Sequence, residues 1–332
     1  MDTQKKALIT GAAGQDGLIL GIKLVNRGLQ VHGVVRNQDQ VETVARINPR
    51  MSVSILDSSN PATVTNFLQK QAPDFIYHLS ARSSVANSWE ESEQTMQVNV
   101  FHTLNWLNGI KKLGMKEVRF YQASSSEMFG LPKESPQNEK TLLHPRSPYG
   151  VSKVAAHHLV VNYRESYGFF ASTGILFNHE SPLRSPSFVT RKITKGVASI
   201  AKGLSDSITL GNLEVSRDWG WAPDYVEGMI SILEHDQPDD FVLATGVSRS
   251  LKEFMSTAFN AIGVSDWEAK VKSDDSLFRP AEVVSVVGDA SKARRILGWQ
   301  PSESFEGMVK KMVQFDLDLM ENKTAAMDWR PE

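Results

Sequence analysis

The chain begins with short apolar runs that alternate with longer stretches in which apolar residues recur at helical spacing. The apolar runs have the length of buried strands and cover residues 7–10, 30–35, 52–56, 74–78, 118–122 and 169–177. The stretches with helical spacing cover residues 19–25, 61–71 and 92–113. A repeated strand–helix order of this kind predicts the α/β class with a doubly wound parallel sheet.

The alternation weakens after the sixth run, which indicates a second, smaller part of the molecule. The later elements are a helix from residue 188, a strand at 241–245 that we expect to rejoin the sheet, and two amphipathic helices within 290–321. We therefore expect a Rossmann domain of residues 1–178, to which residues 211–248 partly return. Residues 179–210 and 249–332 are expected to form a smaller, mixed C-terminal lobe that binds the substrate.

The composition is that of a globular protein and excludes several classes of function. Hydrophobic residues make up 41% of the 332 positions and charged residues 22%. The formal net charge of −2 argues against non-specific binding to nucleic acid. The chain has no cysteine, which excludes disulfides and thiolate metal sites, and we expect no metal site. No apolar run has the length of a membrane span or of a signal-peptide core, so we expect a cytoplasmic protein that does not bind membranes.

Three glycines follow the first predicted strand at regular spacing, at Gly11, Gly14 and Gly17. Dinucleotide-binding proteins use the same order of strand, glycine turn and helix, because glycines permit a tight turn and a close approach of the backbone to a pyrophosphate. The alternative is an ordinary turn between a strand and a helix. The regular spacing at the first strand favours dinucleotide binding.

The residues after the next strands bear on which dinucleotide binds. Arg36 follows the second strand, and a guanidinium group there suits the 2′-phosphate of NADP. Asp39 lies nearby and keeps NAD as the alternative, because a carboxylate binds the 2′-hydroxyl group. Asp57 follows the third strand, where it is placed to contact the adenine. Residues 79–83 leave the fourth strand at the edge where ligands of such sheets bind.

Tyr149 and Lys153 are four positions apart, which places them on one face of a helix. A lysine ammonium lowers the pKa of a nearby phenol and so helps the phenol to act as a base near neutral pH. Such a pair also arises by chance on exposed helices, so its neighbours decide the interpretation. Ser125 and Glu127 follow the fifth strand and His179 follows the sixth, and we expect them to face the same pocket.

Three cations in the second half of the chain have two interpretations. Lys192, Arg217 and Arg279 are either solvated surface charges or a clamp for a diphosphate group. Their spacing in the sequence does not decide between the two.

These motifs, in this order, make the chain resemble the extended short-chain dehydrogenase/reductases, and within them the GDP-mannose 4,6-dehydratase family. The resemblance covers nearly the whole chain and is carried by the segments TGAAGQDG (10–17), QASSSE (122–127), PRSPYG (145–150), LFNHESP (176–182), FVTRK (188–192), GNL (211–213), RDWG (217–220) and RPAEV (279–283). It implies a lyase of deoxysugar biosynthesis that converts GDP-mannose to GDP-4-keto-6-deoxymannose by internal hydride transfer and loss of water.

The resemblance also implies roles for individual residues. Tyr149 would remove the proton of the sugar 4-hydroxyl, to which Ser125 is hydrogen-bonded, and Lys153 would hold the nicotinamide ribose. Glu127 would take the proton from C5 and assist loss of the 6-hydroxyl. The implied cofactor contacts are Gly11, Gly14, Gln15, Asp16, Gly17, Arg36, Asp57, Ser58, Leu79, Ser80, Ala81, Ser83, Tyr149, Lys153, His179 and Arg184. The implied contacts to the nucleotide sugar are Ser88, Asn178, Val189, Lys192, Arg217, Arg279 and Glu282.

Related functions stay open as alternatives. A GDP-4-keto-6-deoxymannose reductase shares the Tyr149/Lys153 pair and fits the short loop after Arg36 better, whereas residues 178–182 and 217–219 favour the dehydratase. A nucleotide-sugar epimerase would have no task for Glu127, and a non-catalytic dinucleotide-binding protein would not need these side chains. In the family that the chain resembles, the loop after Arg36 helps to build a tetramer. Because this loop is short here, we expect either a homodimer or a homotetramer.

Overall fold

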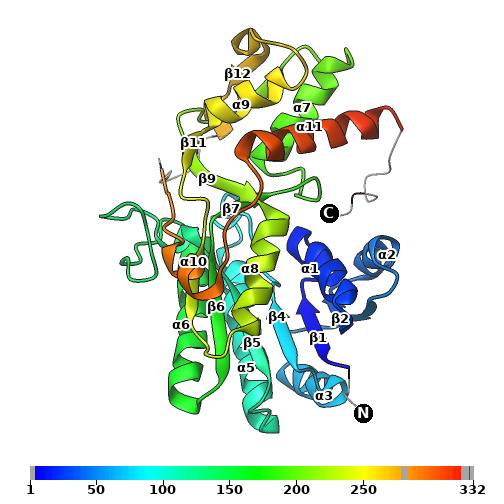
Figure 1. The fold of residues 1–332 in the computed structure, drawn as a ribbon, viewed down its shortest axis with the longest axis vertical. Coiled ribbons are helices and arrows are strands. Elements are labelled where there is room, and N and C mark those ends of the chain that lie inside the picture. The colour runs from blue at the N-terminus through cyan, green and yellow to red at the C-terminus, as the bar shows by residue number, and fades with distance from the viewer. Residues whose placement is uncertain (1–3, 278–282, 284, 323–328, 330–332) are drawn as a thin grey trace.

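The main sheet has seven parallel strands in the order β10-β6-β5-β4-β1-β2-β3 (Figure 1). It is seen in a computed structural model that describes residues 4–277, 283, 285–322 and 329. The strands span Lys6–Thr10 (β1), Gln30–Val35 (β2), Ser52–Ile55 (β3), Phe75–His78 (β4), Arg119–Ser125 (β5), Phe170–Leu176 (β6) and Asp240–Leu243 (β10). This order confirms the predicted doubly wound sheet and the return of the chain near residue 241.

The strand order reverses beside β1. This strand pairs with β2 on one side and with β4 on the other, and Thr10 at its end is opposite His78 at the end of β4. Ligands of open α/β sheets bind at the carboxyl ends of the strands where the order reverses. The glycine turn after Thr10 and the segment after His78 both leave the sheet at this point.

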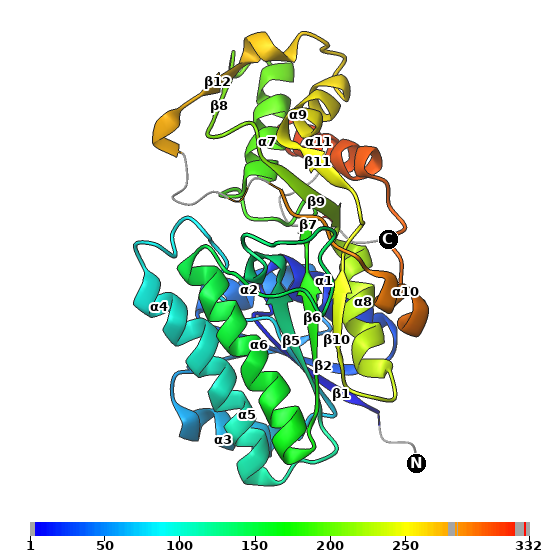
Figure 2. The same ribbon diagram turned by 90° about the vertical axis from the view of Figure 1, so that its left-hand side faces the viewer.

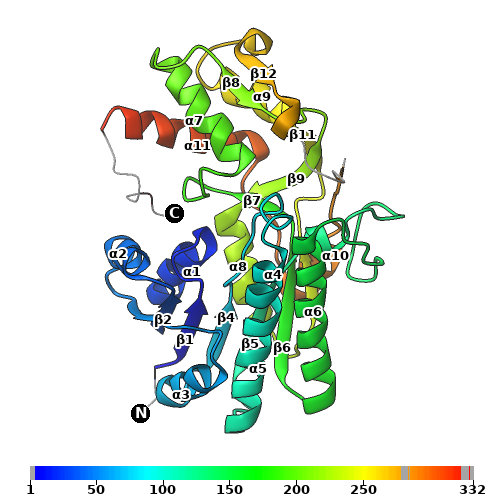
Figure 3. The ribbon, with the colours of Figure 1, turned by 180° about the vertical axis from the view of Figure 1, so that it is seen from behind.

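Helices cover both faces of the sheet (Figures 2 and 3). One face carries α1 (Gln15–Asn26) and α8 (Ala222–Glu234), and the other carries α3 (Pro61–Gln71), α5 (His102–Leu113) and α6 (Pro148–Tyr167). Neighbouring residues of β1 supply both cores: Ile9 packs in the cluster that includes residues of α1 and α8, and Leu8 packs with Trp106 of α5. Strands that are buried on both faces need apolar residues at every position, which is why they appear in the sequence as continuous apolar runs.

The second lobe lies beyond the carboxyl ends of the main sheet (Figure 1). Its three-stranded sheet has the order β11-β9-β7, and a two-stranded sheet pairs β12 with β8. These strands span Asn178–Glu180 (β7), Ile208–Leu210 (β8), Ser216–Trp221 (β9), Ser248–Ser250 (β11) and Val271–Ser273 (β12). The lobe also contains α7 (Val189–Ala201), α9 (Leu251–Asn260) and α11 (Phe305–Met320), whose apolar faces enclose a separate core around Trp219, Phe254 and Met312. The expected smaller mixed lobe is therefore present, and its predicted residue limits stay a prediction.

The remaining elements include two that the sequence pattern did not predict. Residues 38–47 form α2 (Gln38–Ile47), which starts at Asn37, whose side chain accepts a hydrogen bond from the amide of Gln40 at 3.1 Å. The helix expected over residues 92–113 consists of α4 (Ser92–Met96), a π-helical turn η1 (Gln97–Phe101) and α5. The other short helices are η2 (Ser126–Met128), η3 (Trp267–Lys270), η4 (Asp275–Leu277) and α10 (Ser291–Leu297). Within the described ranges, none of the helices combines the length and the apolar character that a membrane span requires.

Candidate active site

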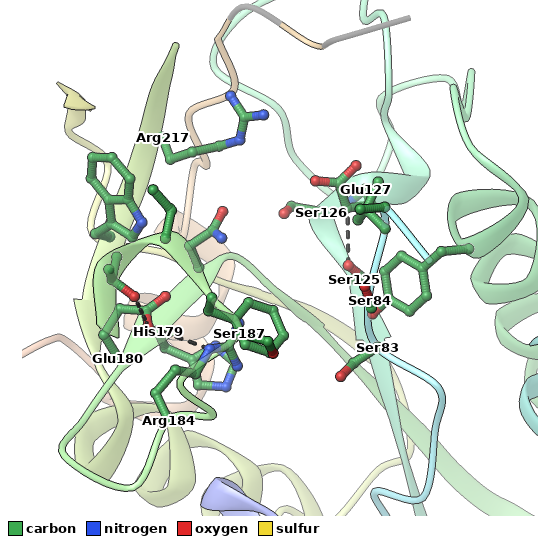
Figure 4. Close-up of a pocket in the computed structure, with 18 of the residues that line it drawn as sticks. Ser83, Ser84, Ser125, Ser126, Glu127, His179, Glu180, Arg184, Ser187 and Arg217 are labelled. Carbon is green, nitrogen blue, oxygen red and sulfur yellow. Dashed lines mark hydrogen bonds and ion pairs between the residues drawn. The ribbon is translucent and has the colours of Figure 1, made fainter. Parts of the chain in front are cut away.

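A cavity of about 460 Å³ lies at the carboxyl ends of the main sheet, below the second lobe. One wall comes from the segments that follow β4 and β5, and the opposite wall comes from β7 and the loop after it (Figure 4). Figure 4 shows Ser125 and Glu127 on one side of the opening, with His179 and Arg184 on the other. The volume is within the range of sites that bind small molecules.

Tyr149 and Lys153 reach this cavity from the first turns of α6. The helix starts here because the Ser147 hydroxyl accepts a hydrogen bond from the amide of Gly150 at 3.0 Å and Pro148 occupies the first helical position. Both side chains are buried and line the cavity, as their spacing predicts. The Lys153 ammonium lies 5.8 Å from the centre of the Tyr149 ring.

Burial dominates the protonation of this pair. Burial raises the pKa of Tyr149 to about 12, although a hydrogen bond with Ser125 acts to lower it. Burial also lowers the pKa of Lys153 to about 8. The Lys153 ammonium by itself is expected to lower the pKa of the Tyr149 phenol. The pKa is raised instead, because excluding water from a phenolate outweighs the favourable contacts. In the free protein Tyr149 therefore keeps its proton at neutral pH, and Lys153 is mostly an ammonium ion.

Ser125 and Glu127 lie on the turn that ends β5. The backbone amide of Glu127 donates a hydrogen bond to the Ser125 hydroxyl at 3.2 Å, which holds the Ser125 side chain against this turn. Gly150 packs against this turn, and a Cβ atom at Gly150 would lie only 2.7 Å from the carbonyl oxygen of Glu127. The missing side chain at Gly150 allows α6 to approach closely enough for Tyr149 and Glu127 to line the same cavity.

Asn99 supports this arrangement from the π-helical turn, and sequence reasoning missed it. Its side chain donates to the Ser152 hydroxyl at 2.9 Å and to the Arg82 carbonyl at 3.2 Å, and accepts from the Arg82 amide at 2.8 Å. Ser152 in turn donates to the carbonyl oxygen of Tyr149 at 2.7 Å. The only signal in the sequence is an asparagine within a helical pattern, and π-helical turns often occur at functional sites.

The turn after β1 has the geometry that a bound dinucleotide requires. Gly11 has a φ of 71°, and a Cβ atom there would lie 2.9 Å from the backbone of Ser80. The turn delivers the N-terminus of α1 at Gly14, where no side chain caps the first amide groups. Free amides at a helix N-terminus bind pyrophosphate groups. The residues therefore fit the predicted cofactor.

The predicted cofactor residues form two groups, those that line the cavity and those that do not. Asp16, Leu79, Ala81, Ser83, His179 and Arg184 line the cavity together with Tyr149 and Lys153. Those that do not line it are Gly11, Gly14, Gln15, Gly17, Arg36, Asp57, Ser58 and Ser80. Arg36 and Asp57 follow β2 and β3 at the same edge of the sheet. The extended dinucleotide site therefore stays a prediction.

Ionic contacts organise the wall formed by β7. The His179 ring nitrogen Nε2 lies 3.0 Å from Asp16 Oδ2, and Arg184 Nε lies 3.3 Å from Glu180 Oε2. The Arg184 guanidinium also stacks on Phe188, 3.8 Å from the centre of its ring. Glu180 and Phe188 line the cavity but were not predicted from the sequence, although the position of Glu180 directly after His179 was a signal.

The predicted nucleotide-sugar residues are only partly brought together. Asn178, Val189, Lys192 and Arg217 line the cavity, and Arg217 Nη1 donates to the carbonyl oxygen of Val283 at 2.8 Å. Lys192 is exposed and Arg217 is buried, and both line the same cavity. The diphosphate clamp stays a prediction.

Of the remaining predicted contacts, one lies away from the cavity and two fall outside the described residues. Ser88 is buried, donates its hydroxyl to the Val85 carbonyl at 2.7 Å and does not line the cavity. Arg279 and Glu282 lie outside the described residues. Polar lining residues that were not predicted include Ser84, Asn87, Ser126, Ser187, Thr190 and Asn212.

Comparison with known proteins gives consistent matches over almost the whole chain. The sequence model of the family described as GDP-mannose 4,6 dehydratase matches residues 8–312. The chain is 43% identical over 342 aligned positions to GDP-mannose 4,6 dehydratase 2 of Arabidopsis thaliana, covering 99% of this chain and 91% of the relative. It is 42% identical to GDP-mannose 4,6-dehydratase of Vibrio cholerae, covering 95% and 94%.

A comparison of structures gives the same fold. The structure of RMD from Pseudomonas aeruginosa complexed with NADPH superposes with a TM-score of 0.78 and 22% sequence identity. The match covers 95% of this chain and 98% of the other. At this identity the likeness concerns the fold alone.

Proposed function

The chain belongs to the GDP-mannose 4,6-dehydratase family, and we propose that it converts GDP-mannose to GDP-4-keto-6-deoxymannose with NADP as its cofactor. The observation that carries the proposal is that Glu127 shares one cavity with Ser125, Tyr149 and Lys153. Hydride transfer to or from a sugar needs only the last three residues. A carboxylate beside them supplies the proton transfer that loss of water also requires.

Each of these side chains has a defined task. Tyr149 takes the proton of the 4-hydroxyl once its own phenol proton has been lost, and Ser125 is hydrogen-bonded to the same oxygen. The positive charge of a bound nicotinamide ring would favour that loss, because a nearby cation lowers the pKa of a phenol. Bound NADP would supply a reversible hydride acceptor for this chemistry and would not be consumed by it. Glu127 takes the proton that the 4-ketone has made acidic at C5 and passes a proton to the departing 6-hydroxyl, which leaves as water. Lys153 holds the nicotinamide ribose by its ammonium group.

The cations of the cavity set the orientation of the substrate. Lys192 and Arg217 bind the diphosphate of GDP-mannose, because guanidinium and ammonium groups make charge-assisted hydrogen bonds with phosphate oxygens. Arg36 selects NADP through its 2′-phosphate, and NAD is the alternative cofactor.

The protein acts in the cytoplasm as a homodimer or a homotetramer. The support for self-association is a pair of exposed apolar side chains on helical elements in contact, Phe101 of η1 and Val151 of α6. Light scattering of the purified protein tests this part of the proposal. A monomer at micromolar concentration contradicts it.

The hydride cycle gives a direct test of the reaction. Purified protein is incubated with GDP-mannose in deuterated water, without added cofactor. We expect a 4-keto-6-deoxy product that carries deuterium at C5, because Glu127 exchanges its proton with solvent before C5 is protonated again. A Tyr149→Phe variant is the control and should give no product.

One outcome contradicts the proposal in favour of a reductase. The protein would then leave GDP-mannose unchanged and oxidise NADPH or NADH stoichiometrically when the 4-keto sugar is supplied.

A further inference from the structure

The glycine turn is hydrogen-bonded to β7, the strand that follows the sixth strand of the main sheet. Gln15 donates to the carbonyl oxygen of His179 at 3.1 Å and accepts from the Ser181 hydroxyl at 2.8 Å. Asp16 Oδ2 lies 3.0 Å from His179 Nε2. We call Gln15, Asp16, His179 and Ser181 the turn–strand cluster. The contacts that join its two halves span 163 to 166 positions of the sequence.

The contacts of His179 define its protonation. Nδ1 lies 2.7 Å from the carbonyl oxygen of Phe177, and Nε2 lies 3.0 Å from the carboxylate of Asp16. A carbonyl oxygen and a carboxylate can only accept hydrogen bonds, so both contacts require a hydrogen on each ring nitrogen. A neutral imidazole carries only one such hydrogen. The geometry is therefore that of an imidazolium ion.

The other charged and titratable groups around this pair leave the arrangement in place. The positive charge of Arg184 acts to lower the pKa of His179. Arg184 is itself paired with Glu180. Tyr225 of α8 stacks on the His179 ring at 4.8 Å. The negative charge of Asp16 also acts to raise the pKa values of Lys153, Tyr149 and Tyr121. Asp16 raises the pKa of His179 although burial lowers it, and His179 lowers the pKa of Asp16 although burial raises it.

We infer that Asp16 and His179 form a positioning ion pair that sets the charge of the glycine turn, so that dinucleotide affinity depends on the proton of His179. This inference rests on the proposed function. Asp16 lies in the first turn of α1, close to the amides that bind a pyrophosphate. A carboxylate there repels a diphosphate unless a cation balances it, and the His179 imidazolium supplies that cation.

The sign of the pH dependence follows from the direction of the His179 pKa. Because that pKa is raised above 6.5, the balancing charge is fully present below this value and is lost as the pH rises through the pKa of the folded state. Above that pKa, no positive charge on His179 balances the Asp16 carboxylate. We expect NADPH to bind about tenfold more weakly there, the size of one lost charge-assisted hydrogen bond.

The test measures the dissociation constant of NADPH by fluorescence between pH 5.5 and about 9, in the absence of any sugar nucleotide. In the wild-type protein the affinity should fall as the pH rises. Asp16→Asn should lose the part of this fall that comes from His179, since no carboxylate is left to balance, and should keep only the part that comes from deprotonation of Lys153, whose pKa is about 8. His179→Gln should bind weakly at every pH. The exposed His158→Gln is the matched control and should follow the wild type.

A second measurement does not depend on the variants. Carbon-13 NMR of labelled histidine rings, assigned by the loss of one signal in His179→Gln, gives the titration of His179 in the wild-type protein. Titration below the ordinary value overturns the inference, as does an Asp16→Asn variant whose NADPH profile matches the wild type. Because no sugar is present, these results are independent of whether the protein dehydrates GDP-mannose.

Discussion

The Lys153 ammonium donates a 2.9 Å hydrogen bond to the carbonyl oxygen of Ala123, the residue two positions before Ser125. This contact joins the first turns of α6 to the end of β5, and so joins the two segments that carry Tyr149 and Glu127. It also keeps a charged group in a place where only 4% of the residue is exposed. The position of Lys153 therefore serves the site at a cost to stability.

Replacing Lys153 by methionine should abolish turnover and stabilise the free protein. The folded pKa of about 8 lies below the ordinary 10.5, so the folded state holds fewer protons than the unfolded state between these values. The wild-type free energy of unfolding therefore rises with pH across that window. At pH 7 we expect the free energy of unfolding of Lys153→Met to exceed that of the wild type by about 1–3 kcal/mol. This is a net value, because the variant also loses the hydrogen bond to Ala123.

Urea unfolding of the cofactor-free protein at pH 7 and pH 10 checks this prediction. The difference between the variant and the wild type should shrink at the higher pH. The exposed Lys195→Met serves as the control and should show no such change. A variant that is less stable than the wild type at pH 7 would falsify the prediction.

Replacing Glu127 by glutamine should separate the redox step from the loss of water. The amide keeps the size of the side chain but cannot take the proton from C5. We expect a transient absorbance of bound NADPH after GDP-mannose is added, with product formation reduced by at least about 100-fold. Stopped-flow absorbance and product analysis measure the two events. The exposed Glu134→Gln should behave like the wild type, and normal product formation by Glu127→Gln would remove Glu127 from the mechanism.

Replacing Gly150 by alanine should impair catalysis without touching a reacting group. The added methyl group would lie 2.7 Å from the Glu127 carbonyl oxygen and 3.1 Å from Pro145 Cβ, so α6 or the turn after β5 must shift. We expect kcat to fall by at least about tenfold and stability to fall by about 1–3 kcal/mol. Steady-state kinetics and thermal unfolding measure both, with the exposed Ser166→Ala on the same helix as control. Wild-type kcat in Gly150→Ala would show that the close approach is not needed.

Replacing Asp316 by asparagine should weaken the second lobe. Arg191 and Asp316 are 3% and 1% exposed, and Arg191 Nη2 lies 2.7 Å from Asp316 Oδ1. Removing one charge leaves the other buried and uncompensated, so we expect a loss of about 3–5 kcal/mol in the free energy of unfolding. Because Arg191 precedes Lys192 on α7, binding of GDP should weaken as well.

Urea unfolding and calorimetric titration with GDP check these two effects. Asp318→Asn, on the same helix and half-buried, should change stability by less than about 0.5 kcal/mol. Equal small effects of the two substitutions would mean that the buried ion pair does not stabilise the lobe.

Local pattern was enough to predict the main sheet and the positions of several site residues. Continuous apolar runs marked the strands because both faces of the sheet are covered, and the spacing of Tyr149 and Lys153 placed them on one helix face. The helix over Gln38–Ile47 was missed because its apolar residues are few and only Val44 and Ile47 are buried. The π-helical turn that carries Asn99 was missed because one inserted residue barely disturbs a helical pattern.

The sequence by itself determined the class of fold, the dinucleotide turn and the residue types that carry the chemistry, because these depend on periodicity and on neighbours within a few positions. Only the tertiary structure decided which charges meet. Asp16 pairs with His179 across 163 positions, and Arg191 pairs with Asp316 across 125. Burial is also a tertiary property, and it reverses the expected direction of the Tyr149 pKa. Whether a charge is balanced or exposed to water depends on the packing of distant segments, which no local pattern records.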